Sequence, residues 1–303
     1  MTELQRYLAE EVAEDLADGI ITRREAMRRL GLLGVSGALA TGLLSAAASE
    51  ASAAKKPARS ERKNSGRIGR TGEWAPVATE AITFPGPNGT LSGAWAPAPG
   101  RARGTVLVIH ENRGLTDHIR NVAGRFAADH WSALAIDLLS EEGGTASFPG
   151  EAEVQAALAA VPPARFDADM KAAVSELRRR VPRKPVNAIG FCFGGGMVWR
   201  LLAAGERRLA AAAPFYGPFP EGGDLSDARA AVLGVYGGLD TRVNATRDAA
   251  KAALEEARLK HLIFTFTEAN HAFFNDTNPA RFNAPAAEEA WARVLTWFAR
   301  HRG

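Results

Sequence analysis

From residue 105 onward, short apolar segments alternate with amphipathic ones along the chain. Most of the apolar segments are continuous runs, which is typical of strands covered on both faces. Strands are predicted over residues 105–110, 132–139, 186–192, 210–217, 230–238 and 261–269. Helices are predicted over residues 118–130, 151–160, 165–180, 194–206, 244–258 and 285–301. This alternation predicts an α/β fold, a mostly parallel twisted sheet with helices on both faces.

Ahead of these segments, residues 81–98 read "AITFPGPNGTLSGAWAPA". Two short strand-like runs flank Pro87-Asn88-Gly89, a turn sequence, and this pattern predicts a β-hairpin. The hairpin and the alternating segments together predict one folded domain over residues 76–303.

The first part of the chain has the three parts of an export signal. Thr22-Arg23-Arg24 opens it, Leu30 to Ala48 is a charge-free run of small and apolar residues, and Ala51-Ser52-Ala53 is an A-x-A-type cleavage site. The opening resembles a twin-arginine signal, with Ala26 where that motif usually has Phe. We therefore expect residues 1–53 to engage export machinery and to be cleaved near Ala53, giving a periplasmic or extracellular protein. The alternative is an uncleaved helix that anchors the chain in the membrane.

Residues 54–75 are polar, basic and rich in glycine, and they predict a flexible linker. The chain of 303 residues has a net charge of +3, and much of its positive excess lies before residue 71. Downstream, acidic and basic residues are mixed without a basic stripe, so we expect no nucleic-acid partner. A single cysteine excludes an internal disulfide and a cysteine-rich zinc site.

Chemically capable side chains follow several predicted strands directly. His110 and Glu111 follow the first of them, Cys192 the third, Asp240 the fifth, and Asn270 and His271 the sixth. In a parallel sheet the carboxyl ends of the strands meet at one edge, where functional residues gather. We therefore expect these side chains to lie near one another.

Cys192 lies within Gly-Phe-Cys-Phe-Gly-Gly, where Gly190, Gly194 and Gly195 surround it. This is the pattern of a nucleophile elbow, a strained turn from strand to helix whose neighbours must be nearly free of side chains. Such a turn exposes the sulfur at a helix N-terminus and makes the Phe193 N–H available to an oxyanion. The alternative is an inert buried cysteine. A phosphate-binding loop needs Lys and Ser/Thr where Met197 and Val198 stand, and a redox switch lacks a second cysteine.

The order Cys192, Asp240, His271 is the chain order of an α/β-hydrolase triad. Two alternatives remain at this stage: Asp240 as a helix N-cap and His271 as a loop histidine without a role. A metal-dependent hydrolase using His110, Glu111 and His118 lacks the spacing of His-Glu-x-x-His. A non-catalytic binding protein on the same fold is the other alternative.

"HENRGL", "GFCFGG", "GGLD" and "NHAFFN" fall in an order that resembles the dienelactone hydrolase family of α/β-hydrolases, over about residues 76–303. The resemblance implies a carboxylic ester hydrolase, carboxymethylenebutenolidase-like, that opens an ester or lactone through an acyl-enzyme, without a metal or organic cofactor. It implies that Cys192 is the nucleophile and that Asp240 and His271 complete the triad. It also implies that Glu111 contacts the resting thiol and that the N–H groups of Asn112 and Phe193 form the oxyanion hole.

Dienelactone hydrolases hold the substrate carboxylate with two arginines, one shortly after the catalytic histidine and one after strand four. Residues 273–276 and 140–160 contain no arginine here, although Arg113 and Arg281 are near in sequence. The resemblance therefore implies the chemistry but not the family's own substrate. A set of aromatic residues favours a more apolar pocket: Phe148, Trp199, Phe215, Tyr216, Phe273 and Phe274. Neither the natural substrate nor the choice between monomer and homodimer follows from the sequence.

Overall fold

The structure, a computed structural model, describes the backbone of residues 1–54 and 76–303 and the side chains of residues 1–47 and 76–303. Its contacts divide it into two compact units. Among the described residues, one comprises residues 1–54 with 150–160, and the other comprises residues 76–149 with 161–303. Residues 55–75 of the predicted linker lie outside the described part of the chain.

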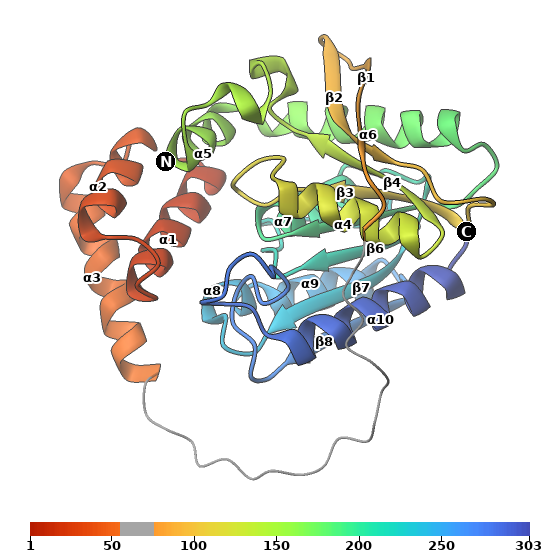
Figure 1. Cartoon of the computed structure of the whole chain (residues 1–303). Helices are drawn as coiled ribbons and strands as arrows, with labels where there is room; N and C mark the ends of the chain where they lie inside the picture. Colours follow the sequence, from red (N-terminus) through yellow and green to blue (C-terminus); the bar gives the residue numbers. More distant parts are fainter. Residues whose placement is uncertain (55–75) are drawn as a thin grey trace. The chain divides into compact units, whose positions relative to one another are not determined.

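The larger unit is built on an eight-stranded sheet in the order β1-β2-β4-β3-β5-β6-β7-β8 (Figure 1). Its strands are β1 (Glu80–Pro85), β2 (Thr90–Ala96), β3 (Gly104–Ile109), β4 (Trp131–Asp137), β5 (Val186–Phe191), β6 (Leu209–Phe215), β7 (Ala231–Gly237) and β8 (His261–Phe266). The first two strands form the predicted hairpin, and β2 pairs antiparallel with β4. All pairings from β4 to β8 are parallel.

Helices cover both faces of this sheet, which confirms the predicted α/β fold (Figure 1). On one face, α4 (Asp117–Ala128) packs against β2, β3 and β4, and α10 (Ala284–Arg300) against β6 and β7. On the other face, α6 (Pro163–Arg180) packs against β3, β4 and β5, and α7 (Phe193–Ala203) against β3, β5 and β6. Two 3₁₀ turns follow β4, η1 (Ser140–Glu142) and η2 (Thr145–Ser147), and α8 (Thr241–Asn244) and α9 (Arg247–Glu256) lie between β7 and β8.

The continuous apolar runs form the strands because both of their faces are covered. Every residue of β3, β4, β5 and β7 is buried. The outer strands β1 and β8 expose part of their side chains, as expected at the edges of a sheet. The carboxyl ends of β3, β5, β7 and β8 therefore present their following residues at one edge of a rigid core.

The smaller unit is helical: α1 (Glu3–Ala17), α2 (Arg23–Leu32), α3 (Gly37–Ala54) and α5 (Glu151–Ala160). Arg28 and Arg29 of α2 pair with Glu153 and Glu151 of α5 at 2.6 and 3.2 Å. By its contacts, α5 therefore belongs to the same unit as the N-terminal helices. In the sequence, α5 lies within the predicted domain of residues 76–303.

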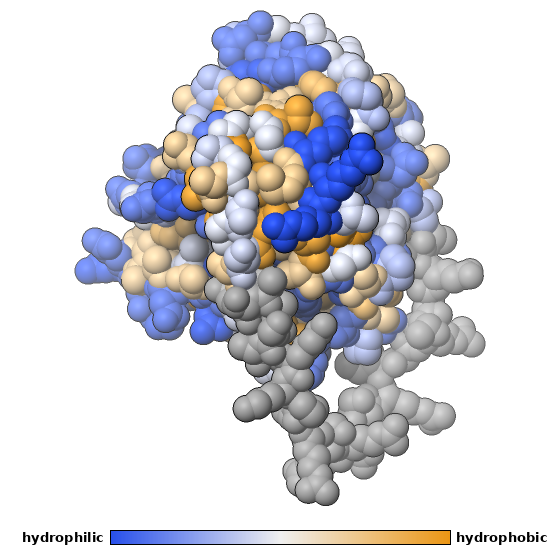
Figure 2. Space-filling view, turned by 90° about the vertical axis from the view of Figure 1, so that its left-hand side faces the viewer, coloured by the Kyte–Doolittle hydropathy of each residue, from blue (hydrophilic) through white to orange (hydrophobic). Residues whose placement is uncertain are grey.

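The surface of the smaller unit carries both apolar and charged side chains. Leu32 and Leu39 are 45% exposed, and Arg23 and Arg24 in the first turn of α2 are also exposed. Figure 2 shows a face of the molecule on which hydrophobic areas border strongly hydrophilic ones. Within the described residues, no helix combines the length and the apolar character needed to cross a bilayer.

Candidate active site

Cys192 lies in the sharp turn between β5 and α7. Its backbone, with φ +56° and ψ −121°, is in a sparsely populated region that costs about 1–3 kcal/mol. Two backbone hydrogen bonds hold the turn: the Cys192 N–H donates to the Phe215 carbonyl, and the Gly196 N–H donates to the Cys192 carbonyl, both at 3.1 Å. The thiol is therefore fixed at the N-terminus of α7, where the helix dipole favours a thiolate.

The glycines around Cys192 are required by close backbone packing. A Cβ on Gly190 would lie 2.0 Å from the Gly194 carbonyl oxygen. A Cβ on Gly194 would lie 2.4 Å from the Ile109 carbonyl oxygen, and one on Gly195 would lie 2.3 Å from the Phe215 carbonyl oxygen. All three distances are far below any real contact of a Cβ, so each position admits only hydrogen.

His271 and Asp240 form a buried pair. The Nδ1 of His271 lies 2.6 Å from Oδ2 of Asp240, and the two side chains are 1% and 0% exposed. The other oxygen, Oδ1, accepts the Val243 N–H at 3.0 Å, so Asp240 also caps α8. Burial acts to raise the pKa of Asp240, but its charge and hydrogen-bond interactions with His271 outweigh it and hold the pKa below its usual value. Asp240 therefore stays ionised beside the imidazole.

The sulfur of Cys192 and a ring nitrogen of His271 lie within 4.8 Å of each other. Tyr216 packs its ring edge-on against His271 with centroids 5.2 Å apart, and it is fully buried. Burial, and then the nearby Glu111 and Cys192 groups, raise the pKa of Tyr216 well above its usual value, so its ring stays neutral. The sequence places Tyr216 only among the aromatic residues of an expected pocket, and nothing in it marks this contact with the histidine.

Glu111 and Asn112 follow β3, and each is 5% exposed. One carboxylate oxygen of Glu111 accepts a hydrogen bond from Nδ2 of Asn275 at 2.7 Å. Among the described residues, the other oxygen, Oε1, is buried without a hydrogen-bond partner. Asn275 is itself held by Thr277, whose N–H and hydroxyl both donate to its side-chain oxygen. The sequence marks position 275 only by the absence of an arginine, and no local pattern signals the contact of Asn275 with Glu111.

The residue after Asn275 ties the same loop to helix α4. Asp276 accepts from Nδ1 of His118 at 3.0 Å and from Arg125 at 2.5 Å. Burial acts to raise the pKa of Asp276, but these two bonds outweigh it and lower the pKa. The three residues considered above for a metal site form hydrogen bonds with different partners. His118 binds Asp276, Glu111 binds Asn275, and His110 binds backbone groups.

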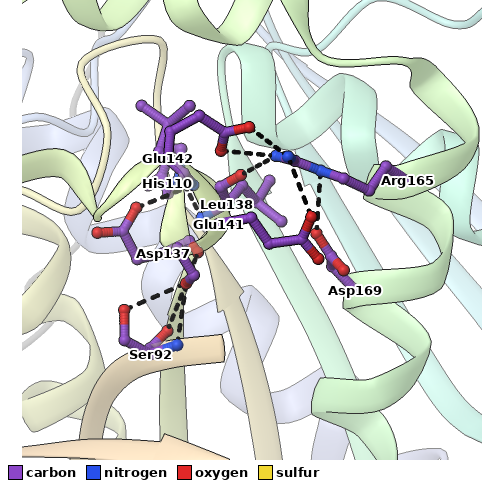
Figure 3. A network of polar contacts seen from close by, with 10 residues as sticks. Ser92, His110, Asp137, Leu138, Glu141, Glu142, Arg165 and Asp169 are labelled. Carbon is purple, nitrogen blue, oxygen red and sulfur yellow. Dashed lines mark hydrogen bonds and ion pairs between the residues drawn. The ribbon is translucent and has the colours of Figure 1, made fainter. Parts of the chain in front are cut away.

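An arginine that no sequence motif marks lies against the loop after β4. Arg165 of α6 donates to the Leu138 carbonyl at 3.1 Å and forms ion pairs with Glu142, Glu141 and Asp169 (Figure 3). Three carboxylates surround this guanidinium and balance its positive charge. Arg165 therefore holds the loop in place and does not present an unopposed positive charge to a substrate carboxylate. Of the two arginines named from the sequence, Arg113 is half-buried and Arg281 is buried.

The aromatic residues expected near a pocket are mostly core. Phe148 is half-buried, and five are fully buried: Trp199, Phe215, Tyr216, Phe273 and Phe274. Phe215 contacts Tyr216, Phe273 and Phe274, with ring centroids 5.7–6.4 Å apart. Four of the six rings, those of Phe215, Tyr216, Phe273 and Phe274, therefore pack against one another, and whether any of the six lines a pocket stays a prediction.

Comparison with known proteins agrees with this fold. Residues 93–302 match the profile of the dienelactone hydrolase family. A protein from Escherichia coli O157:H7 named as a carboxymethylenebutenolidase is 33% identical over 213 residues, 65% of this chain and 77% of that protein. One of the same name from Synechocystis is 31% identical over 243 residues, 73% of this chain and 96% of that protein. A crystal structure titled as a dienelactone hydrolase, from Klebsiella pneumoniae, has a TM-score of 0.65 at 25% identity, covering 74% of this chain and 98% of that one.

Proposed function

The chain belongs to the dienelactone hydrolase family, and from this premise we propose that it hydrolyses a small ester or lactone with a Cys192–His271–Asp240 triad. The family and the α/β-hydrolase fold make it a hydrolase. The observation that carries the triad is the approach of the Cys192 sulfur, on its strained elbow, to the ring of His271, whose Nδ1 is bonded to Asp240. No observation favours a non-catalytic binding role.

In the acylation step, Nε2 of His271 takes the thiol proton, because Nδ1–H donates to Asp240 and fixes the tautomer. The thiolate of Cys192 attacks the carbonyl carbon and forms a tetrahedral intermediate. As this collapses, the carbon–oxygen bond breaks, the His271 proton passes to the leaving oxygen, and a thioester remains on Cys192. Ionised Asp240 stabilises the imidazolium that carries the proton between these two events.

The oxyanion of the intermediate is assigned to the N–H groups of Phe193 and Asn112. Phe193 is the first residue of α7, and Asn112 follows the end of β3, the neighbour of β5 in the sheet. One such donor is worth about 3 kcal/mol of transition-state stabilisation. Water activated by His271 then attacks the thioester, and the acid leaves as the thiol is restored.

We assign Glu111 to control of the resting thiol. Its buried carboxylate disfavours a nearby thiolate by like-charge repulsion, so the sulfur stays less reactive until substrate arrives. In an oxidising exported environment this would limit sulfenic acid formation. Alkylation of the thiol by iodoacetamide in wild type and Glu111→Ala tests the assignment: we expect faster reaction in the variant, and equal rates would reject it.

The triad is tested by hydrolysis of short p-nitrophenyl esters and simple lactones. Cys192→Ala should lose the activity, and intact-mass analysis of wild type under rapid quench should detect one acyl group. Because Cys192 is the only cysteine, iodoacetamide labels one site and its incorporation counts active thiols. Full activity in Cys192→Ala, or an acyl group on another residue, would overturn the assignment.

We also propose that residues 1–53 direct export by the twin-arginine route. The support is a paired arginine, Arg23 and Arg24, exposed at the start of α2 and followed by the apolar sequence of α3. Replacing both by lysine should retain the full-length chain inside a bacterium that has this route, whereas the same change at Arg178 and Arg179 should not. N-terminal sequencing of the exported protein should begin near Ala54. A full-length chain in the membrane fraction would indicate an anchor instead.

A further inference from the structure

His110 occupies the position between β3 and Glu111, and its side chain is fully buried. Its Nδ1 lies 2.6 Å from the Glu111 carbonyl oxygen. Its Nε2 lies 3.2 Å from the backbone nitrogen of Leu138, just after the end of β4 (Figure 3). The ring thus bridges two neighbouring strand ends through backbone groups alone.

These two partners determine the tautomer of the ring. The Leu138 N–H can only donate, so Nε2 must accept and carries no proton. The proton is therefore on Nδ1, which donates to the Glu111 carbonyl. Burial lowers the pKa of His110, so the ring remains in this neutral form.

The Glu111 carbonyl belongs to the same peptide group as the Asn112 N–H. That peptide is trans, like the others in the described residues, so its N–H points away from its carbonyl. The carbonyl also accepts the Gly114 N–H at 3.1 Å. Two donors therefore hold one side of the peptide, and rotating it would break both bonds and turn the Asn112 N–H around.

The same ring contacts the residue that carries the other assigned oxyanion donor. His110 stacks on Phe193 with ring centroids 5.9 Å apart and an interplanar angle of 24°. One side chain is thus bonded to the peptide of Asn112 and packed on the first residue of α7. An oxyanion site depends on donors held in place before the reaction, because reorienting them during it would cost part of their stabilisation.

We propose that His110 is a positioning residue that holds the Asn112 and Phe193 N–H groups in the arrangement that binds the oxyanion. It acts through the peptide with which it forms a hydrogen bond and through the ring on which it stacks. This role rests on the proposed function, since it requires an acyl-transfer reaction at Cys192.

Two substitutions separate the hydrogen bonds from the stacking. His110→Gln can donate to the Glu111 carbonyl and accept from Leu138 but loses the ring, whereas His110→Phe keeps a ring beside Phe193 and loses both bonds. We expect His110→Phe to lower kcat for ester hydrolysis about 100-fold with KM changed less than about threefold, as for loss of one oxyanion donor. His110→Gln should recover most of this loss. His261→Gln is the matched control, because His261 also directs Nδ1 to a backbone carbonyl, at the opposite end of the sheet.

Alkylation of Cys192 by iodoacetamide proceeds at a saturated carbon and forms no oxyanion, so its rate should stay within about threefold of wild type in both variants. A substrate-like trifluoromethyl ketone, which adds the thiol and forms an oxyanion, should bind His110→Phe about 100-fold more weakly. If His110→Phe does not fold, His110→Met, a flexible side chain without a donor, replaces it in the comparison. Unchanged kcat in the folded variant, or a parallel loss of alkylation, would overturn the role of His110. No ester hydrolysis in wild type, or full activity in Cys192→Ala, would instead overturn the proposed function.

Discussion

Replacing Asp240 by asparagine changes one carboxylate oxygen to an amino group, although both oxygens of Asp240 already accept hydrogen bonds. Oδ1 accepts the Val243 N–H at 3.0 Å, and Oδ2 accepts from Nδ1 of His271 at 2.6 Å. In the variant the amide oxygen stays on Val243, because the amino group cannot accept. The amino group then faces His271 and donates to Nδ1, which forces the proton of the imidazole onto Nε2. The nitrogen needed as the base is then already protonated.

The size of the effect follows from what the correct tautomer would require. Turning the amide around sets its amino group against the Val243 N–H, which breaks the helix cap and leaves this buried donor unsatisfied, at a cost of about 1–3 kcal/mol. Only about one molecule in 5 to 150 would hold the active tautomer. Loss of the negative charge that stabilises the imidazolium lowers the rate further. We expect kcat to fall about 10³–10⁴-fold, the scale of the corresponding change in serine proteases.

The assay is kcat and KM for a short p-nitrophenyl ester, with unfolding in urea as a check of structure. Asp276→Asn is the matched control, because it makes the same change in a second His–Asp pair, in which His118 is buried and Asp276, on the same loop as His271, is 27% exposed. We expect the control to lose stability, since Asp276 also binds Arg125, but to keep kcat within about tenfold of wild type. A folded Asp240→Asn with kcat within tenfold of wild type would refute the reasoning, as would equal losses in both variants.

Three further outcomes are expected. Gly194→Ala would bring a Cβ to 2.4 Å from a backbone oxygen at the end of β3, so we expect a loss of more than about 2 kcal/mol in urea unfolding, whereas Gly196→Ala, whose nearest contact is 3.4 Å, should be tolerated; equal stabilities would contradict this. Asn275→Ala removes the donor to Glu111 and should lower the free energy of unfolding by about 1–3 kcal/mol and shift the pH profile of thiol alkylation; an unchanged profile would show that this bond does not reach the thiol. Burial raises the pKa of Asp169 to about 6, so the folded state holds this proton more tightly than the unfolded state and loses stability as pH rises from about 4 to 6. Asp169→Asn should therefore be more stable than wild type by about 1–3 kcal/mol at pH 8 but not at pH 4; no difference at pH 8 would refute this.

The strands and helices of the larger unit could be predicted because its core is repetitive. Runs such as residues 105–110 and 230–238 are apolar throughout, and a sheet covered on both sides is the arrangement that buries them. The predicted helix over residues 244–258 differs in detail, since the chain forms the short α8 and then α9. Asp240 is indeed a helix N-cap, through Oδ1, and it also holds His271 through Oδ2. Because its carboxylate has two oxygens, Asp240 can cap the helix and hold His271 at the same time, whereas the sequence presented these two roles as alternatives.

The candidate site could be predicted only as far as residue type and strand position determine it. Cys192 and His271 follow strands, and their chemistry marks them. The contacts of Asn275 and Arg165 could not be predicted, because each joins residues far apart in sequence through side-chain directions that no local pattern records. The role that we give to His110 depends on a backbone N–H of another strand end, for which any residue at position 138 other than proline would serve.

The loop after β8 connects the candidate site to the surrounding fold at three residues. His271 binds Asp240, Asn275 binds Glu111, and Asp276 binds helix α4. A neutral amide, that of Asn275, holds Glu111, and an amide hydrogen bond stabilises a carboxylate without cancelling its charge. In the function that we propose, the charge of Glu111 therefore remains available to act on the thiol. Because one short loop orients both the base and this carboxylate, a displaced loop changes both together. Only paired measurements, kcat for the base and thiol alkylation for the carboxylate, can assign the effect of a substitution there to one of them.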